Sequence, residues 1–157
     1  MSEIPKKYEF KMRRLVEFYE TDLAGIVHYS NFFRYMESAE HAFFRSLGIS
    51  VLMDKHMPPY GWPRVHTECD FKAPLKFEDE IEIRVLVAEM KTKTLTFVFR
   101  ITKINGPTPI EVAVGKFVTV CVTLGDKGTF QSMPIPKSLT DMIEVAPPEL
   151  LKMENRG

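Results

Sequence analysis

The segment of the sequence best suited to chemistry places a carboxylate, Asp22, and a glycine, Gly25, just before a predicted helix. The first turn of a helix has backbone N–H groups without intrahelical partners and carries a partial positive charge. Such groups can stabilise the oxyanion that forms when a carbonyl carbon is attacked. Asp22 is near enough in sequence to approach the same point, as a nucleophile or as the base for a water molecule. The alternative is that Asp22 only caps the helix or orders a turn.

Other catalytic motifs are absent from the sequence, which has no Gly-x-Ser-x-Gly elbow, phosphate-binding glycine loop, Rossmann fingerprint or His-Glu-x-x-His. His66, Glu68 and Asp70 alternate along a predicted strand and would share one face, as metal ligands could. Solvent-facing strand positions are polar by default, so we interpret them as surface residues and predict no metal site and no cofactor. Cys69 and Cys121 lie in strand-like segments and are interpreted as core thiols.

One long helix is predicted from about residue 30 to residue 47. Its apolar residues recur at steps of four, three, four and four, which places them in one stripe on the helix surface. Gly48 follows as a plausible C-terminal cap. The stripe residues are Phe32, Met36, Ala39, Phe43 and Leu47.

The remaining chain is predicted to consist mainly of β-strands. One strand, within residues 8–18, precedes the helix, and four follow it. Residues 110–124 are largely apolar at both even and odd positions, which point to opposite faces of a strand, so this strand is predicted to be covered on both faces. A single helix then has to cover one face of an antiparallel sheet, so the predicted class is α+β. We expect one domain over residues 1–145 and a flexible tail over residues 146–157.

Composition restricts the classes of partner. Lys plus Arg and Asp plus Glu both number 21, so the basic excess of a nucleic-acid-binding protein is missing. The sequence has no secretion signal and no run of about 18 apolar residues that could span a membrane, so we expect a cytoplasmic protein. One helix cannot cover about five long strands, and a second copy is the simplest cover for the remaining apolar surface. We therefore expect a homodimer or homotetramer.

The segment 18–32 resembles the signature of the 4-hydroxybenzoyl-CoA thioesterase family. The signature combines an Asp, a Gly three residues later, a Val two residues after that, an Asn-aromatic pair and a carboxylate in the helix. The corresponding residues are Asp22, Gly25, Val27, Asn31, Phe32 and Glu37. The resemblance extends to the β-α-β-β-β-β order over nearly the whole chain. It implies the hotdog fold, in which a five-stranded antiparallel sheet wraps one long helix, and hydrolysis of acyl-CoA or aroyl-CoA thioesters.

The same resemblance implies that Asp22 is the catalytic carboxylate and that the N–H of Tyr29 contributes to the oxyanion site. Many acyl-CoA thioesterases of this type carry His where this chain has Tyr29, with His28 before it. The aromatic residue resembles the aroyl-CoA branch. The family's helix often reads Glu-x-Ala-Arg, whereas here Glu40 takes the place of Arg and falls inside the apolar stripe, where a carboxylate needs a partner. Glu40 could hold a substrate hydroxyl or amine, pair with a basic group across a dimer, or reach solvent.

Recognition of CoA is predicted at a turn between two strands that contains Lys91, Lys93 and Thr94. In the family, basic and hydroxyl residues of this hairpin meet the nucleotide phosphates, although lysines are also common in solvated turns. Trp62 is expected either to line an acyl pocket or to close the core. Two alternatives stay open, namely a non-catalytic module that binds acyl-CoA and a thioesterase specialised for a naphthoate-type CoA ester.

Overall fold

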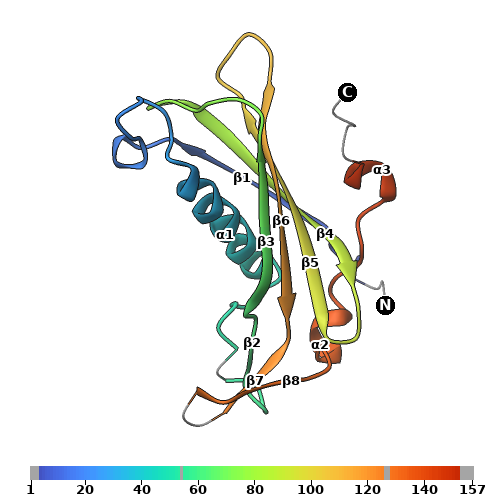
Figure 1. Cartoon of the computed structure of the whole chain (residues 1–157). Coiled ribbons are helices and arrows are strands. Elements are labelled where there is room, and N and C mark those ends of the chain that lie inside the picture. The colour runs from blue at the N-terminus through green and yellow to red at the C-terminus, as the bar shows by residue number, and fades with distance from the viewer. Residues whose placement is uncertain (1–3, 54, 126–127, 153–157) are drawn as a thin grey trace.

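A computed structural model describes residues 4–53, 55–125 and 128–152 of the chain (Figure 1). One long helix is followed by strands and two short helices. The elements are β1 (Glu9–Leu15), η1 (Phe18–Glu20), α1 (Tyr29–Ser46), β2 (Tyr60–Gly61), β3 (Arg64–Phe71), β4 (Glu80–Met90), β5 (Thr94–Lys103), β6 (Ile110–Val120), β7 (Val122–Leu124), β8 (Phe130–Ser132), α2 (Lys137–Thr140) and α3 (Pro148–Leu151).

Five strands form one antiparallel sheet in the order β1-β4-β5-β6-β3, and α1 lies across one face of it (Figure 1). This arrangement confirms the predicted α+β hotdog fold. The predicted long strand over residues 110–124 is two strands, because β6 ends at Val120 and β7 joins a small second sheet with β2 and β8. As predicted, β6 is buried on both faces near its middle, where residues 112–115 are all buried.

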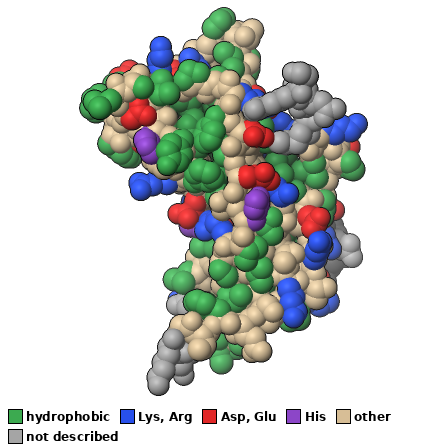
Figure 2. All heavy atoms as spheres, in the orientation of Figure 1, with side chains coloured by type: hydrophobic (Ala, Val, Ile, Leu, Met, Phe, Trp, Pro, Cys, Tyr) green, Lys and Arg blue, Asp and Glu red, His purple; other side chains and the backbone are tan. Residues whose placement is uncertain are grey.

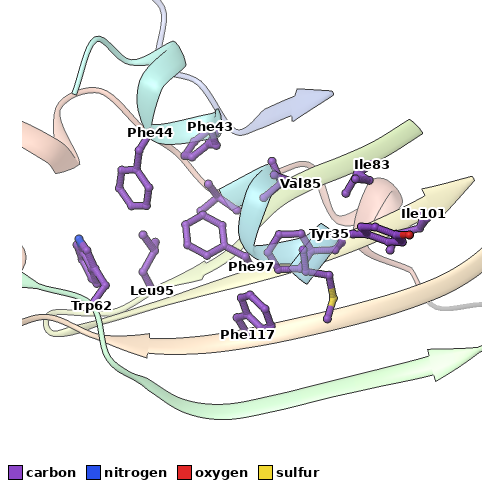
Figure 3. Close-up of a cluster of buried hydrophobic side chains, with 14 of the residues drawn as sticks. Tyr35, Phe43, Phe44, Trp62, Ile83, Val85, Leu95, Phe97, Ile101 and Phe117 are labelled. Atoms are coloured by element: carbon purple, nitrogen blue, oxygen red, sulfur yellow. The ribbon is translucent and has the colours of Figure 1, made fainter. Parts of the chain in front are cut away.

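The core forms between the apolar stripe of α1 and the facing side of the sheet. Phe43 contacts Phe97 with ring centroids 5.9 Å apart, and both are buried (Figure 3). Met36 packs so closely on Gly115 of β6 that a Cβ added there would lie 2.0 Å from the Met36 sulfur. Gly48 ends the helix with a φ of 80°, which confirms its predicted role as a cap. Side chains that alternate along β4 and β5 complete the core, including Ile83, Val85, Leu95 and Ile101.

One edge of the large sheet is open at β3. β6 is its only neighbour among the described residues, and most β3 side chains are exposed. The unpaired N–H and C=O groups of an edge strand can pair with another chain. This edge adjoins the N-terminal half of α1, where Phe32 contacts Phe71 at the end of β3 with ring centroids 5.1 Å apart.

The C-terminal segment lies against the strands β4 and β5. Ala146 donates its N–H to Val87 O at 2.8 Å, and Arg100 donates to Leu150 O and to Lys152 O. Residues 153–157 of the predicted tail lie outside the described residues, so the domain boundary at 145 stays a prediction. Within the described ranges no helix is long and apolar enough to cross a membrane.

Candidate active site

A tight turn holds Asp22 in front of α1. Asp22 donates its backbone N–H to Ile26 O and accepts from Gly25 N–H, both at 2.9 Å. Gly25 has a φ of 77°, a left-handed conformation that glycine adopts without strain. One carboxylate oxygen of Asp22, Oδ1, accepts from Ala24 N–H at 2.8 Å. The other oxygen has no hydrogen-bond partner among the described residues and is available for chemistry.

The N-terminus of α1 has one backbone N–H without a partner among the described residues. His28 is the N-cap, and its Nδ1 accepts from Ser30 N–H at 3.3 Å, while Asn31 N–H donates to His28 O at 2.9 Å. The N–H of Tyr29 donates to no group in the part of the chain that the structure describes. The Tyr29 N–H is therefore free to bind a developing oxyanion.

Asp22 and Tyr29 line one pocket of about 560 Å³ at the open edge of the sheet. Phe32 of α1 and Phe71 of β3 form much of its apolar wall, and Lys72 adds a cation. Figure 2 shows hydrophobic side chains gathered at the upper left, over the N-terminal end of α1. The full lining is Asp22, Ile26, Val27, Tyr29, Phe32, Phe71, Lys72, Ala73 and Pro74.

Comparisons with known proteins identify the family. The model of the thioesterase-like superfamily matches residues 16–143. This chain belongs to the thioesterase-like superfamily. The match covers the Asp22 turn, α1 and strands β3 to β6, so the predicted resemblance to a hotdog thioesterase family is confirmed.

Three relatives illustrate the similarity. A protein of Aquifex aeolicus (strain VF5) is 33% identical over 138 residues, covering 86% of this chain and 98% of that protein. The 1,4-dihydroxy-2-naphthoyl-CoA hydrolase of Synechococcus elongatus is 24% identical over 140 residues, covering 87% of this chain and 96% of that protein. The solved structure of a gentisyl-coenzyme A thioesterase is 30% identical with a TM-score of 0.72, covering 86% of this chain and 100% of that chain.

The fold of this thioesterase-like chain brings Asp22, Gly25, His28 and Tyr29 together, and adds residues that sequence reasoning missed. Phe71 and Lys72 reach the pocket from the end of β3, more than forty residues later in the chain. In the sequence the only feature that marks Phe71 and Lys72 is their position at the end of a predicted strand. A third omission, Glu20, is a buried carboxylate that looked like an ordinary turn residue.

Glu40 is buried, with 1% of its surface exposed, so the interpretation that it reaches solvent is wrong. Arg64 at the start of β3 donates from Nη2 to Glu40 Oε1 at 3.3 Å and contacts Glu37 Oε2 at 3.4 Å. The Arg64 guanidinium also lies over the ring of Phe117, 4.6 Å from its centroid. The basic partner of Glu40 therefore belongs to the same chain. Neither Glu37 nor Glu40 lines the Asp22 pocket.

Burial gives Glu40 an unusual titration. Desolvation, with a smaller contribution from Glu37, raises the pKa of Glu40 from 4.5 to about 7 although Arg64 opposes the shift. Between pH 4.5 and about pH 7 the Glu40 carboxyl is ionised in the unfolded chain but still protonated in the folded chain. The contribution of Glu40 to stability is therefore fully present below pH 4.5 and falls as the pH rises to about 7.

Replacing Glu40 with Gln is expected to remove this pH dependence. The free energy of unfolding of the wild type, minus that of Glu40→Gln, should fall by about 3 kcal/mol as the pH rises through this range. Urea unfolding at several pH values measures the difference. If the free energy of unfolding changes with pH by the same amount in the two proteins, Glu40 does not have the raised pKa.

The turn between β4 and β5, which carries the lysines, lies at the far end of the sheet from the loop that precedes α1 (Figure 1). The Asp22 turn contacts the chain just before β4, because Val27 N–H donates to Leu75 O, whereas Lys91 and Lys93 follow the end of β4. β4 has 11 residues. At about 3.3 Å per residue its two ends lie on the order of 30 Å apart. One chain alone does not bring the predicted phosphate ligands to the predicted catalytic residues.

The turn itself has the predicted tight geometry. Lys91 N–H donates to Thr94 O at 3.0 Å. Both lysines are exposed, with the ammonium of Lys91 3.3 Å from Glu89 Oε1 and that of Lys93 3.5 Å from Ser132 Oγ. These contacts are weak in solvent. The ammonium groups therefore remain available to a phosphate.

Trp62 and the cysteines belong to the core region and not to the Asp22 pocket. Trp62 is 7% exposed and packs against Phe44 (Figure 3). It also packs against Tyr60, so of the two predicted roles it closes the core. Cys121 is fully buried and Cys69 packs against the core. Burial raises the pKa of the Cys121 thiol to about 11 and that of Cys69 to about 12, which keeps both protonated. Among the described residues no group of three His, Cys, Asp or Glu side chains could hold a metal ion.

Proposed function

We propose that this protein hydrolyses acyl-CoA or aroyl-CoA thioesters to the free acid and CoA. The observation that carries the proposal is that Asp22, with one unpartnered carboxylate oxygen, and Tyr29, whose N–H has no partner among the described residues, line the same pocket. The Tyr29 N–H binds the carbonyl oxygen as negative charge develops on it. Asp22 either attacks the carbonyl carbon or removes a proton from the attacking water. The C–S bond then breaks, and CoA leaves as a thiolate that takes up a proton. If Asp22 is the nucleophile, this step leaves the acyl group on Asp22 as a mixed anhydride, which water hydrolyses to release the free acid and restore the carboxylate.

The proposed site is completed by a second copy of the chain. The pocket opens at the unpaired edge of β3, which a partner's β3 could extend across a twofold axis. Antiparallel pairing of two such edges reverses one sheet relative to the other. The lysine turn of one copy then approaches the Asp22 end of its partner. The protein is accordingly proposed to be a homodimer, or a homotetramer built from two such dimers.

A panel of CoA thioesters, assayed with a reagent that detects the released thiol, tests the proposed hydrolysis. Turnover of at least one ester supports it. Tight binding of acyl-CoA without turnover of any ester would instead support the alternative of a non-catalytic binding module. The proposed reaction needs no metal and no redox cofactor, and the cytoplasmic location stays a prediction.

An aromatic acyl group is the second, narrower proposal. Two of the relatives are a 1,4-dihydroxy-2-naphthoyl-CoA hydrolase and a gentisyl-coenzyme A thioesterase, whose substrates carry aromatic acyl groups. In this chain Phe32, Phe71 and Tyr29 place three aromatic rings along the pocket, and ring-on-ring contacts favour a flat acyl group. Aroyl esters should accordingly give higher kcat/KM values than aliphatic esters of similar size in the same panel.

Replacing Lys91 and Lys93 with Ala is expected to raise KM for a CoA thioester while leaving kcat nearly unchanged. Phosphate contacts are remote from the reacting carbonyl and stabilise ground and transition states about equally. The increase in KM should shrink at high salt, because salt screens exposed charges. The pair Lys11→Ala and Lys137→Ala removes the same charge from exposed residues elsewhere and serves as the control. An unchanged KM at low salt would assign Lys91 and Lys93 to an ordinary solvated turn.

A further inference from the structure

Glu20 is a buried carboxylate two residues before Asp22, with 4% of its surface exposed. Its Oε1 accepts from Arg14 Nη2 at 2.5 Å, from Glu17 N–H at 2.8 Å and from the Tyr35 hydroxyl at 3.0 Å. Arg14 also lies over the Tyr35 ring, 4.6 Å from its centroid. Burial and the neighbouring Glu20 raise the pKa of the Tyr35 hydroxyl, so it remains a hydrogen-bond donor. These contacts tie η1 to β1 and to the middle of α1.

The backbone of Glu20 is held against the start of α1. Its carbonyl oxygen accepts from His28 N–H at 2.9 Å and from Asn31 Nδ2 at 2.8 Å. The turn that carries Asp22 begins directly after Glu20 and ends at His28, the N-cap of α1. Glu20 thus joins the two ends of this turn, because its carbonyl oxygen is bonded to His28. These two hydrogen bonds hold Glu20 against the start of α1, beside Tyr29.

We propose that Glu20 is a positioning residue that holds Asp22 and the Tyr29 N–H at their working separation. The inference rests on the proposed function, because it assumes that these two groups act on one thioester. Misplacement of reacting groups by about 1 Å can cost on the order of 100-fold in rate. A carboxylate that serves three donors of fixed geometry resists such displacement. A neutral amide can still accept at the Oε1 position, but it lacks the negative charge that strengthens the bond from the Arg14 guanidinium.

Glu20→Gln is expected to lower kcat about 10-fold or more and to leave KM within about 2-fold, because substrate binding does not use Glu20. The melting temperature should also fall, since Arg14 loses its charged partner. Kinetics are measured well below that temperature on the thioester found by the panel. Wild-type kcat in folded Glu20→Gln would overturn the inference.

Asp79→Asn is the matched control. Asp79 is also buried, accepts from Lys76 N–H at 2.8 Å through Oδ2 and contacts Lys103 Nζ at 3.3 Å, and its side chain makes no hydrogen bond or ion pair with the described residues 20–31. It should lose stability while keeping kcat within about 2-fold of the wild type. An equal loss of kcat in Asp79→Asn would mean that destabilisation alone lowers the rate, and would overturn the positioning role.

A double-mutant cycle with Asp22→Asn tests whether Glu20 acts through Asp22. In the Asp22→Asn background, Glu20→Gln should add little further loss, because the group it positions is already disabled. A fully additive loss would overturn the inference. If Asp22→Asn keeps full activity, the proposed mechanism fails. If Asp22→Asn loses kcat while Glu20→Gln keeps the wild-type kcat, the mechanism stands and only the positioning role of Glu20 is overturned.

Tyr35→Phe covers the case in which Glu20→Gln does not fold. It deletes one donor to Glu20 and keeps the ring in the core. The expected result is a smaller fall in kcat, about 2-fold to 5-fold, with KM unchanged. An unchanged kcat would overturn the inference in that case.

Discussion

Asp22→Asn is expected to lower kcat about 100-fold or more with almost no change in melting temperature. Asn has the size of Asp, and its amide oxygen can accept the Ala24 N–H bond that Asp22 Oδ1 accepts at 2.8 Å. The turn therefore persists, while the negative charge needed for a nucleophile or base is removed. Steady-state kinetics and thermal unfolding of the two proteins give both quantities.

The same experiment separates catalysis from a purely structural role of Asp22. A residue that only orders the turn would be replaced by Asn without loss, since both side chains cap and turn equally well. Full activity in folded Asp22→Asn would therefore rule out the proposed mechanism. Asp141→Asn replaces an exposed aspartate at the C-cap of α2, outside the pocket, so it is the control for removing a carboxylate and should behave as the wild type.

Mixed dimers of two impaired variants are expected to recover activity. One variant carries Asp22→Asn, and the other carries Lys91→Ala with Lys93→Ala. In a mixed dimer one site combines the intact Asp22 of one copy with the intact lysines of the other. A purified mixed dimer has one intact site, whereas a wild-type dimer has two, so the mixed dimer should approach about half of the wild-type rate at low substrate.

The two variants should be co-expressed with different tags, and the mixed dimer purified before assay. Each variant alone should be slow at low substrate concentration, because Asp22→Asn lowers kcat and the double lysine variant raises KM. A rate equal to the average of the two parents would place Asp22 and the lysines of one working site in the same copy. Sedimentation is the companion measurement, since a stable and active monomer would contradict the shared site.

Much of the fold follows from patterns that are local in the sequence. The apolar stripe predicted a helix over residues 30–47, and α1 covers Tyr29–Ser46. The prediction works because a helix that packs on a sheet must repeat its apolar residues about every 3.6 positions. The sequence predicted one strand over residues 110–124, whereas the chain breaks at Cys121 between β6 and β7. An apolar run does not change composition where the chain leaves one sheet for another, so periodicity could not locate that break.

The candidate site divides in the same way between local and long-range information. Asp22, Gly25, His28 and Tyr29 could be found from the sequence because one turn and one helix end hold them within eight residues. Glu40 could not be assigned, because its partner Arg64 lies 24 residues away and meets it only when β3 packs beside α1.

The sequence by itself thus determined the helix, the order of helix and strands along the chain and the turn that carries Asp22, because neighbouring residues specify backbone conformation through spacing and turn chemistry. Only the tertiary structure decided which charges are buried, which side chains wall the pocket and how far the lysine turn lies from Asp22. Burial and long-range distance depend on which strands pair, and β3 reaches the edge of the sheet by pairing with β6, some fifty residues later in the chain. Glu20 shows the difference most clearly, since three donors from β1, the η1 turn and α1 converge on an acid that the sequence presents as an ordinary loop residue.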